Sequence, residues 1–190
     1  MTWGLVQKAG PSRQGLAPFL LIPVALTGLG CAVERRRPVR SLAEIRQESV
    51  IIQKWDLSCG AAALATLLTY DLGDPVTERA VAEAMLRRND PLKVRVQGGF
   101  SLLDLQQYAE RRGYQAEGYG QLTPIDLATM LPAIVPIQIH GYSHFVIVRS
   151  IANGRVDFAD PAYGKRRLAL DEFADVWPRK IAFVVTRPAR

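Results

Sequence analysis

The sequence predicts an α+β domain in which a helical half precedes an antiparallel sheet. Apolar residues recur at helical spacing between residues 59 and 130, whereas segments rich in β-branched residues follow one another from residue 133 onward. Asn153-Gly154 is in addition a strong signal for a tight turn between two antiparallel strands. Because helices and strands are segregated along the chain, an α+β class is favoured over an alternating α/β class.

Residues 1–33 have the pattern of a targeting segment. Two basic residues precede an apolar run over residues 15–29, which is shorter than the about 20 residues that a membrane-spanning helix needs. We therefore expect export to the periplasm. Cleavage of the segment, its retention as a membrane anchor by residues 1–31, and lipidation at Cys31 are three alternatives that the sequence leaves open.

The folded domain is expected over residues 47–190, after a charged, proline-containing linker over residues 34–46. Residues 50–53 (VIIQ) predict a short strand at the start of the domain. A helix is expected over residues 59–68, because this Ala/Leu-rich segment follows N-cap side chains at residues 56–58 and ends before Gly73 and Pro75. Small residues on every side of this helix indicate that it is buried.

Three more helices and five strands complete the prediction. The helix over residues 77–88 has apolar residues at helical spacing, and the helix that begins at Ser101 has Asp104 in place for a capping box and ends at Gly113. A short strand is expected near residues 114–118 and a helix over residues 123–130. The remaining strands are predicted from β-branched runs over residues 133–139, 144–151, 155–160 and 180–185.

The net charge of +6 is concentrated near the N-terminus. Residues 1–50 hold seven Lys or Arg and three acidic residues, whereas the other 140 residues hold 17 basic and 15 acidic ones. A nucleic-acid surface needs a basic stripe within the fold, and here the basic clusters are scattered among acids. We therefore expect no nucleic-acid partner, and membrane contact only through the N-terminal segment.

The cysteines and histidines give no sign of a metal or a disulfide framework. Cys31 and Cys59 are the only cysteines, and no Cys/His cluster has zinc-finger spacing. His140 and His144 lie four residues apart, but Gly141 and the β-branched flanks argue against a helix that presents both to one ion. With 48% hydrophobic residues, a chain of this length can bury a core unaided. No metal and no cofactor are expected.

Four polar residues together predict nucleophilic chemistry. Cys59 is expected in the first turn of a helix, where free N–H groups stabilise a thiolate. His144 opens a strand and can take the thiol proton, and Asp160, at the end of the next strand, can orient the imidazole. The Gln53 amide can donate to an oxyanion. Each residue alone also has an ordinary role: a buried thiol, a polar strand residue, the first residue of an Asp-Pro turn, or a surface amide.

These residues resemble the motifs of a known family. QKWDLSCG over residues 53–60 resembles the Q-x-x-x-x-x-C-G segment of papain-like cysteine peptidases. HFVIV over residues 144–148 and the following Asp160-Pro161 are similar to the His and Asp-Pro motifs of the bacteriocin-processing, double-glycine peptidases. GGFSLLDL over residues 98–105 and the DEF…W pattern over residues 171–177 also resemble that family, and the likeness covers about residues 47–186.

The resemblance implies a papain-like cysteine peptidase fold and a cysteine endopeptidase. It implies Cys59 as nucleophile, His144 as general base, Asp160 as orienting acid and Gln53 in the oxyanion hole. It further implies a polypeptide substrate, in the family cleaved after Gly-Gly, which is expected to contact Trp55, Gly98, Gly99 and Ser101.

The likeness is strongest to free-standing exported members, some of which accompany secretion systems for amyloid fibres. Two other functions stay open. One is a papain-like module that binds or chaperones an exported polypeptide without cutting it, and the other is acyl transfer by the same residues.

Overall fold

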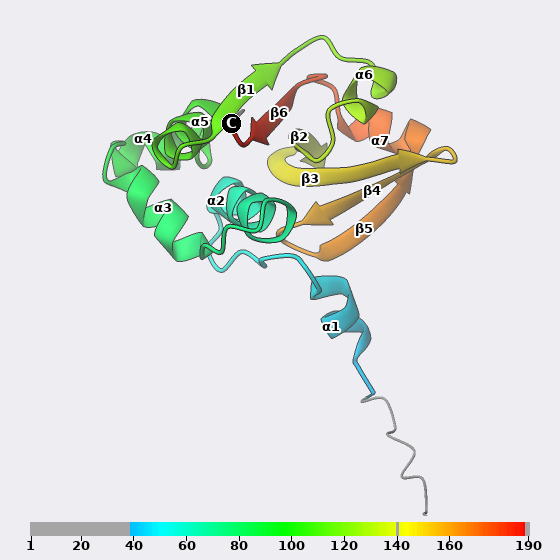
Figure 1. Ribbon diagram of the computed structural model, residues 1–190, viewed down its shortest axis with the longest axis horizontal. Helices are drawn as coiled ribbons and strands as arrows, with labels where there is room; N and C mark the ends of the chain where they lie inside the picture. Colours follow the sequence, from blue (N-terminus) through cyan, green and yellow to red (C-terminus); the bar gives the residue numbers. More distant parts are fainter. Residues whose placement is uncertain (1–38, 140, 189–190) are drawn as a thin grey trace, which may run out of the picture. The chain divides into compact units, whose positions relative to one another are not determined.

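The computed structural model describes residues 39–139 and 141–188 (Figure 1). The expected targeting segment, Cys31 and His140 lie outside the described residues. The helices are α1 (Leu42–Gln47), α2 (Cys59–Thr66), the π-helix η1 (Leu67–Asp71), α3 (Glu78–Leu86), α4 (Pro91–Gln97), α5 (Leu102–Arg111), α6 (Pro124–Ala128) and α7 (Leu170–Val176). The strands are β1 (Gln115–Tyr119), β2 (Ala133–Ile139), β3 (Tyr142–Ala152), β4 (Arg155–Asp160), β5 (Gly164–Ala169) and β6 (Ala182–Thr186).

The strands form one six-stranded sheet in the order β1-β6-β2-β3-β4-β5, in which every neighbouring pair is antiparallel. The predicted α+β class is thereby confirmed. Asn153 and Gly154 both have positive φ, as the tight turn between β3 and β4 requires, and Ala152 pairs with Arg155 across it. This hairpin fixes the register of the two strands that carry His144 and Asp160.

Alternate residues of the strands enter two separate cores. In β2, Ile134 packs toward α2, whereas Ala133 and Val135 pack on the opposite face with α6 and α7. Figure 1 shows α3, α4 and α5 grouped beside α2, away from strands β3 to β5. The domain therefore has a helical part and a sheet part that meet along α2.

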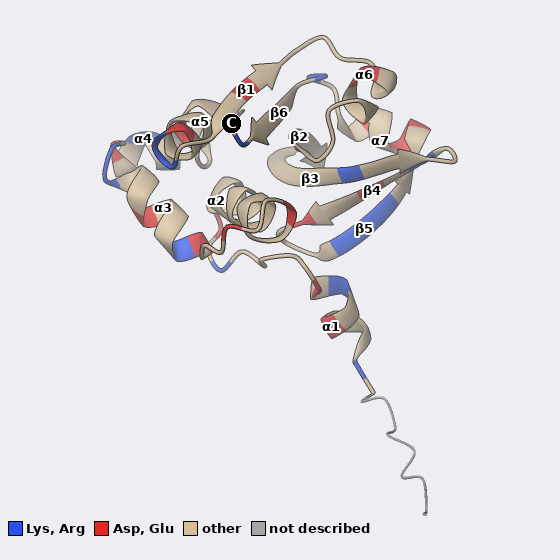
Figure 2. Ribbon diagram, in the orientation of Figure 1, with Lys and Arg blue, Asp and Glu red and all other residues tan. Residues whose placement is uncertain are grey.

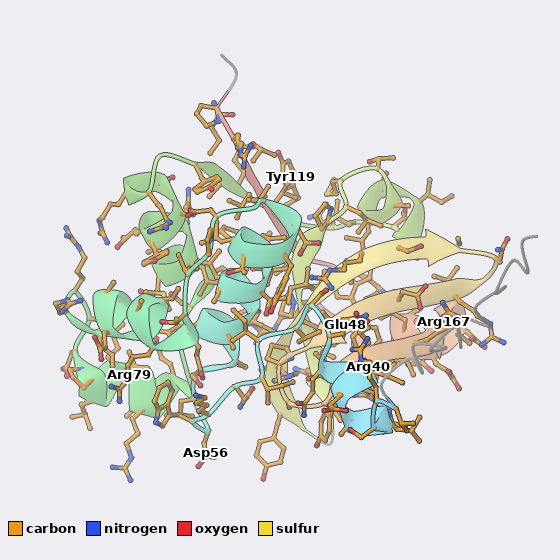
Figure 3. All side chains as sticks on the ribbon, turned by 60° about the horizontal axis from the view of Figure 1, so that its bottom comes forward. Arg40, Glu48, Asp56, Arg79, Tyr119 and Arg167 are labelled. Carbon is orange, nitrogen blue, oxygen red and sulfur yellow. The ribbon has the colours of Figure 1, made fainter. Side chains whose placement is uncertain are left out.

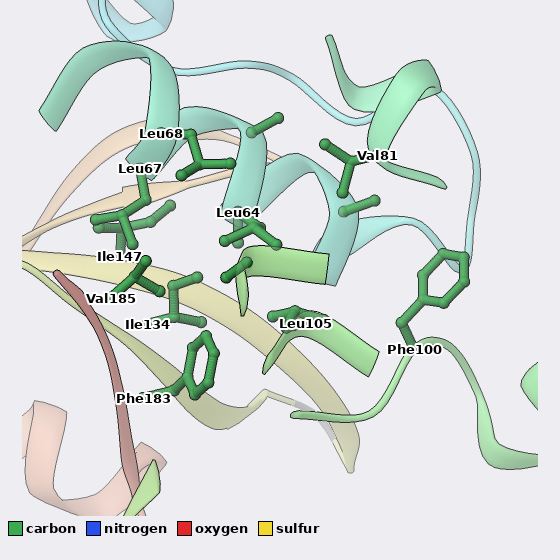
Figure 4. Packing of buried hydrophobic residues seen from close by; sticks show 14 of the residues in the cluster. Leu64, Leu67, Leu68, Val81, Phe100, Leu105, Ile134, Ile147, Phe183 and Val185 are labelled. Atoms are coloured by element: carbon green, nitrogen blue, oxygen red, sulfur yellow. The ribbon is translucent and has the colours of Figure 1, made fainter. Parts of the chain in front are cut away.

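Helix α2 is buried on all sides, as its Ala-rich sequence predicts. Its one leucine, Leu64, and the two leucines of η1 share a core cluster with residues of the strands and of helices α3 and α5 (Figure 4). Gly60 allows this close packing, because a Cβ there would lie 3.2 Å from the Leu105 side chain and 3.3 Å from Phe145. Helix α2 thus places Cys59, at its N-terminus, between the helices and the sheet.

The prediction of a strand over residues 50–53 is wrong. The N–H of Ile51 donates to Thr66 Oγ1 at 3.0 Å, and the N–H of Gln53 donates to the Pro161 carbonyl at 2.8 Å. The segment is therefore extended but is bound to a helix side chain and a loop rather than to a neighbouring strand. The second of these bonds connects the chain before Cys59 to the residue after Asp160.

Helix α1 lies within the stretch that was expected to be a linker. Ser41 and Glu44 form a capping box at its start, and the helix has no buried residue. It is attached to strand β5: a Cβ on Gly164 would lie 2.5 Å from the Arg46 carbonyl oxygen, and Lys165 pairs with Glu48 at 3.0 Å. Figure 2 shows the basic residues along β5, and Figure 3 shows Arg40 and Glu48, which also form an ion pair, side by side at α1.

Sequence patterns gave no prediction for α4, β5 or α7. Helix α4 has Asp90 as N-cap and Pro91 at its first position, which is a typical helix start. Strand β5 carries three consecutive basic residues and lacks the β-branched content that identifies strands. No helix in the described part of the chain is long and apolar enough to cross a membrane.

Candidate active site

The N-terminus of α2 is free of a side-chain cap. Ser58 is the N-cap residue, but its side chain makes no capping hydrogen bond, contrary to the prediction for residues 56–58. Cys59 follows as the first helical residue and is 7% exposed. The free N–H groups and the positive end of the helix dipole therefore face the sulfur, which favours its anionic form.

A buried acid holds the Ser58 hydroxyl away from the helix. Glu78, 3% exposed, accepts from the Ser58 hydroxyl at 2.5 Å and from the N–H of Lys54 at 2.9 Å. The Ser58 hydroxyl also lies 2.7 Å from the Trp55 carbonyl. Glu78 thus connects both ends of the loop over residues 54–58. Sequence reasoning treated Glu78 only as a first-turn acid of α3, because its loop partners lie 20 and more residues away.

His144 and Asp160 contact each other directly. His144 Nε2 lies 2.7 Å from Asp160 Oδ1, and the Asp160 carboxylate is fully buried. The same carboxylate accepts from the N–H of Ala162 at 2.8 Å and from Arg166 at 3.1 Å. These two bonds hold the carboxylate in place independently of the imidazole. Since Nε2 is engaged, Nδ1 is the ring nitrogen left for Cys59.

The three groups shift one another's pKa values toward an ion pair. Burial alone would raise the pKa of Cys59, but hydrogen bonds from the His144 side chain and from the N–H groups of Phe145 and Gly60 lower it overall. Burial would lower the pKa of His144, but Asp160 and Cys59 raise it to about 9. Burial would raise the pKa of Asp160, and its bond to His144 leads the contacts that lower it. The arrangement can therefore hold a thiolate, an imidazolium and a carboxylate together.

Gln53 is tied by its backbone to the residue after Asp160, and its side chain bonds to the loop before Cys59. Its backbone N–H bonds to Pro161, and its side-chain Nε2 donates to the Trp55 carbonyl at 3.2 Å. Its Oε1 is buried and has no hydrogen-bond partner among the described residues. The second N–H of the amide is left to donate to a bound group.

A cleft of about 430 Å³ opens at Cys59. It is lined by the segment that connects α4 to α5 and by parts of the sheet: residues 97–103, Pro136, Ser143, Phe145, Arg179 and Ile181. Of the four residues predicted to bind substrate, Gly98, Gly99 and Ser101 line this cleft. Gly99 has φ +135°, and a Cβ there would lie 3.1 Å from the Leu57 carbonyl, so position 99 itself requires glycine.

Trp55 does not line that cleft. It is 45% exposed and lies on a second, mostly apolar groove of about 380 Å³ along α3 and α4. The Arg79 guanidinium lies 5.9 Å from the centre of its ring, and Figure 3 shows Arg79 on α3. Phe100 lines both hollows, so the groove adjoins the cleft. The structure thus brings together Cys59, His144 and Asp160, and separates Trp55 from them.

Comparison with known proteins identifies relatives of this chain. Residues 47–189 match the peptidase C39 family. Two relatives both carry the name "Probable functional amyloid protease FapD". The protein from Pseudomonas aeruginosa is 44% identical over 154 residues, which cover 80% of this chain and 66% of that protein. The protein from Pseudomonas fluorescens is 38% identical over 174 residues, which cover 91% of this chain and 73% of that protein.

Solved structures show the same fold. The peptidase domain of Streptococcus ComA, a bi-functional ABC transporter, has a TM-score of 0.60 and 18% identity, and the match covers 73% of this chain and 98% of that one. A double glycine motif protease from an AMS/PCAT transporter, solved in complex with the leader peptide, has a TM-score of 0.55 and 26% identity, with 73% and 91% coverage.

Proposed function

Because this chain belongs to the peptidase C39 family and is a cysteine peptidase, we propose that it cleaves an exported, amyloid-forming polypeptide at a double-glycine site. The observation that carries the catalytic part is the contact series from Cys59 through His144 to Asp160. The names of the two Pseudomonas relatives supply the amyloid substrate, and the transporter protease supplies the double-glycine site.

The first half of the reaction follows from the geometry. His144 takes the Cys59 proton, and the sulfur attacks the carbonyl carbon of the scissile peptide bond. The oxyanion that forms accepts from the free N–H of Cys59 and from the second amide N–H of Gln53. When the C–N bond breaks, the imidazolium gives its proton to the leaving amine, and an acyl-enzyme thioester stays on Cys59.

The second half regenerates the thiol. Neutral His144 takes a proton from water, and the resulting hydroxide attacks the thioester carbonyl. The thiolate is expelled as the carbonyl re-forms, the acid product gives its proton to solvent and leaves as a carboxylate, and sulfur and imidazolium form the ion pair again. Asp160 stays ionised throughout and keeps Nε2 protonated, so that Nδ1 always faces the reacting atoms.

Substrate selection divides between the two hollows. Gly98 and Gly99 leave one wall of the cleft without side chains, so that a substrate backbone can approach it closely, and the Gly-Gly preference itself is taken from the double glycine motif protease. The groove beside Trp55 is mostly apolar and adjoins the cleft, so it can take the apolar face of a helical segment of the same substrate. We place the reaction in the periplasm, on the basis of the targeting pattern in residues 1–33.

The test compares purified full-length chain with two cysteine variants. A synthetic peptide with a central Gly-Gly is incubated with each protein, and the products are identified by mass spectrometry. Native chain and Cys31→Ala should cut after Gly-Gly, whereas Cys59→Ala should lose cleavage at least about a thousandfold. Equal cleavage by Cys59→Ala contradicts the assignment of the nucleophile.

The same incubation separates the alternatives. Binding of the peptide without any cleavage by native chain points to a binding module. Incorporation of an added amine in place of water points to acyl transfer.

A further inference from the structure

Among the residues of 39–139 and 141–188 that line the cleft at Cys59, one carries a charged side chain besides the sulfur itself. Arg179, in the connection between α7 and β6, lines the cleft, and the other lining residues are apolar, glycine or neutral polar. A guanidinium that lines the cleft is within reach of a chain bound there, so its charge acts on the nearby side chains of a substrate. Arg179 is therefore the described lining residue, outside the Cys59–His144 ion pair, that can attract an acidic side chain of a substrate.

The backbone around Arg179 is fixed on both sides. Trp177 Nε1 donates to the Ile181 carbonyl at 2.9 Å, which closes the turn, and the Lys180 carbonyl accepts from the N–H of Leu122 at 3.0 Å. Trp177 is itself fully buried. The position from which the Arg179 side chain extends is thus held by the core, even though the side chain is exposed.

The neighbouring cation points elsewhere. Lys180 Nζ lies 4.9 Å from the centre of the Trp177 ring and 3.2 Å from the Ala174 carbonyl. Arg179, by contrast, forms no ion pair with any acid in residues 39–139 and 141–188, whereas most other basic residues of the sheet do. It is also not among the groups that lower the pKa of Cys59. Its hydrogen-bond donors are therefore available to a substrate.

We propose that Arg179 is a specificity-determining residue that binds the carboxylate of an Asp or Glu side chain close to the scissile bond. This rests on the proposed function, since it concerns how a polypeptide lies in the Cys59 cleft. A guanidinium presents parallel N–H donors that match both oxygens of a carboxylate, so an acidic side chain gains a bidentate contact that an amide or a cation cannot make. A free chain terminus carries the same chemical group and is separated from the side chain in the test.

The experiment uses quenched fluorescent Gly-Gly peptides and the full-length chain. One Asp is moved through the four positions that precede the Gly-Gly pair and through the four that follow the scissile bond, and each peptide has matched Asn and Lys versions. At one position kcat/KM should be about fivefold higher for Asp than for Asn, and lowest for Lys. Raising the ionic strength should reduce this difference. Amidated and free C-termini are compared to separate the two sources of the carboxylate.

Variants of Arg179 connect the preference to this residue. Arg179→Gln should make the Asp and Asn peptides equal, and Arg179→Glu should favour Lys at the same position. Arg155→Gln, an exposed arginine at the start of β4 that does not line the cleft, is the matched control and should keep the native preference. Equal rates for Asp and Asn at every position in native chain overturn the proposal while the peptidase function stands.

Binding to Cys59→Ala keeps the two proposals distinguishable. If native chain cuts no peptide but Cys59→Ala binds the Asp peptide more tightly than the Asn peptide, and Arg179→Gln removes the difference, then the peptidase proposal fails and the role of Arg179 holds. If Cys59→Ala binds both peptides equally, the role of Arg179 is refuted.

Discussion

Replacing Asp160 by Asn tests whether the carboxylate keeps the imidazole charged. The two side chains have nearly the same shape, and Asn can still accept from the N–H of Ala162. The negative charge 2.7 Å from His144 Nε2 is lost. The change therefore removes the charge that faces the imidazole, together with the oxygen that accepts from Arg166.

The size of the expected loss of imidazolium follows from the pKa of His144. Contacts with Asp160 and Cys59 raise it from 6.5 to about 9 against the effect of burial. Without the carboxylate it should fall back toward 6.5, because burial then opposes Cys59 alone. At pH 8 the charged fraction of the imidazole drops from about 90% to about 3%, a loss of roughly thirtyfold that corresponds to about 2 kcal/mol.

Alkylation of Cys59 by iodoacetamide measures this directly. In native chain the rate should reach its plateau well below the ordinary pKa of a thiol, because the thiolate is stabilised by the imidazolium. In Asp160→Asn the rise should move toward that ordinary value, and cleavage at pH 8 should fall at least thirtyfold. Asp157→Asn removes an exposed acid of the same strand, paired with Arg167, and should change neither profile. Coinciding alkylation profiles for native chain and Asp160→Asn would refute the reasoning.

Three further predictions concern the surroundings of the site. Glu78→Gln puts an amide where two donors meet a carboxylate, so it should lower kcat/KM about tenfold and the free energy of unfolding by about 2 kcal/mol. Glu110→Gln, an exposed acid on α5 away from both hollows, should change neither, and equal urea midpoints and rates for the two variants contradict this. Gly164→Ala should destabilise the fold more than Gly154→Ala, because both glycines have positive φ but only a Cβ on Gly164 would lie 2.5 Å from a backbone atom, the Arg46 carbonyl oxygen. Equal losses in the free energy of urea unfolding would show that α1 is not held at this contact. The pH profile of cleavage should be bell-shaped. Protonation of the Cys59 thiolate, whose pKa is lowered, sets the acid limb, and loss of the His144 imidazolium proton sets the alkaline limb near pH 9. An alkaline limb near pH 6.5 would contradict the ion pair.

The sequence predicted those parts of the fold whose signals are local. The capping box at Ser101 and Asp104, the turn at Asn153-Gly154 and the buried helix after Cys59 all depend on residues within a few positions of one another, and the structure contains each of them. Strand β5 could not be predicted from the sequence, because its signals are not local. Its Lys and Arg side chains become compatible with a strand only because Asp157, Asp160 and Glu48 lie across from them, and those partners are distant in the sequence or in other elements.

The candidate site shows the same division. Cys59, His144 and Asp160 could be proposed from the chemistry of their side chains and the hairpin that joins two of them. The role of Glu78 could not, because a first-turn acid usually interacts with its own helix, and its burial depends on how α3 packs against the loop over residues 54–58. The diversion of the Ser58 hydroxyl from capping to Glu78 has the same origin.

These contacts also bear on how the effects of substitution combine. A thiolate and an imidazolium buried together cost desolvation energy, which only their mutual contact and the contacts of Asp160 offset. Removing any one member leaves the thiol or the imidazole that stays behind facing the cost of burial without the compensating charge, and that group returns to its neutral form, while Asp160 keeps Arg166 as a partner. A second substitution then removes little further stabilisation of the ion pair. Asp160→Asn combined with Cys59→Ala or His144→Gln should therefore lower cleavage no further than the more severe single change. Additive losses would mean that the carboxylate acts on the reaction by a route other than the imidazole.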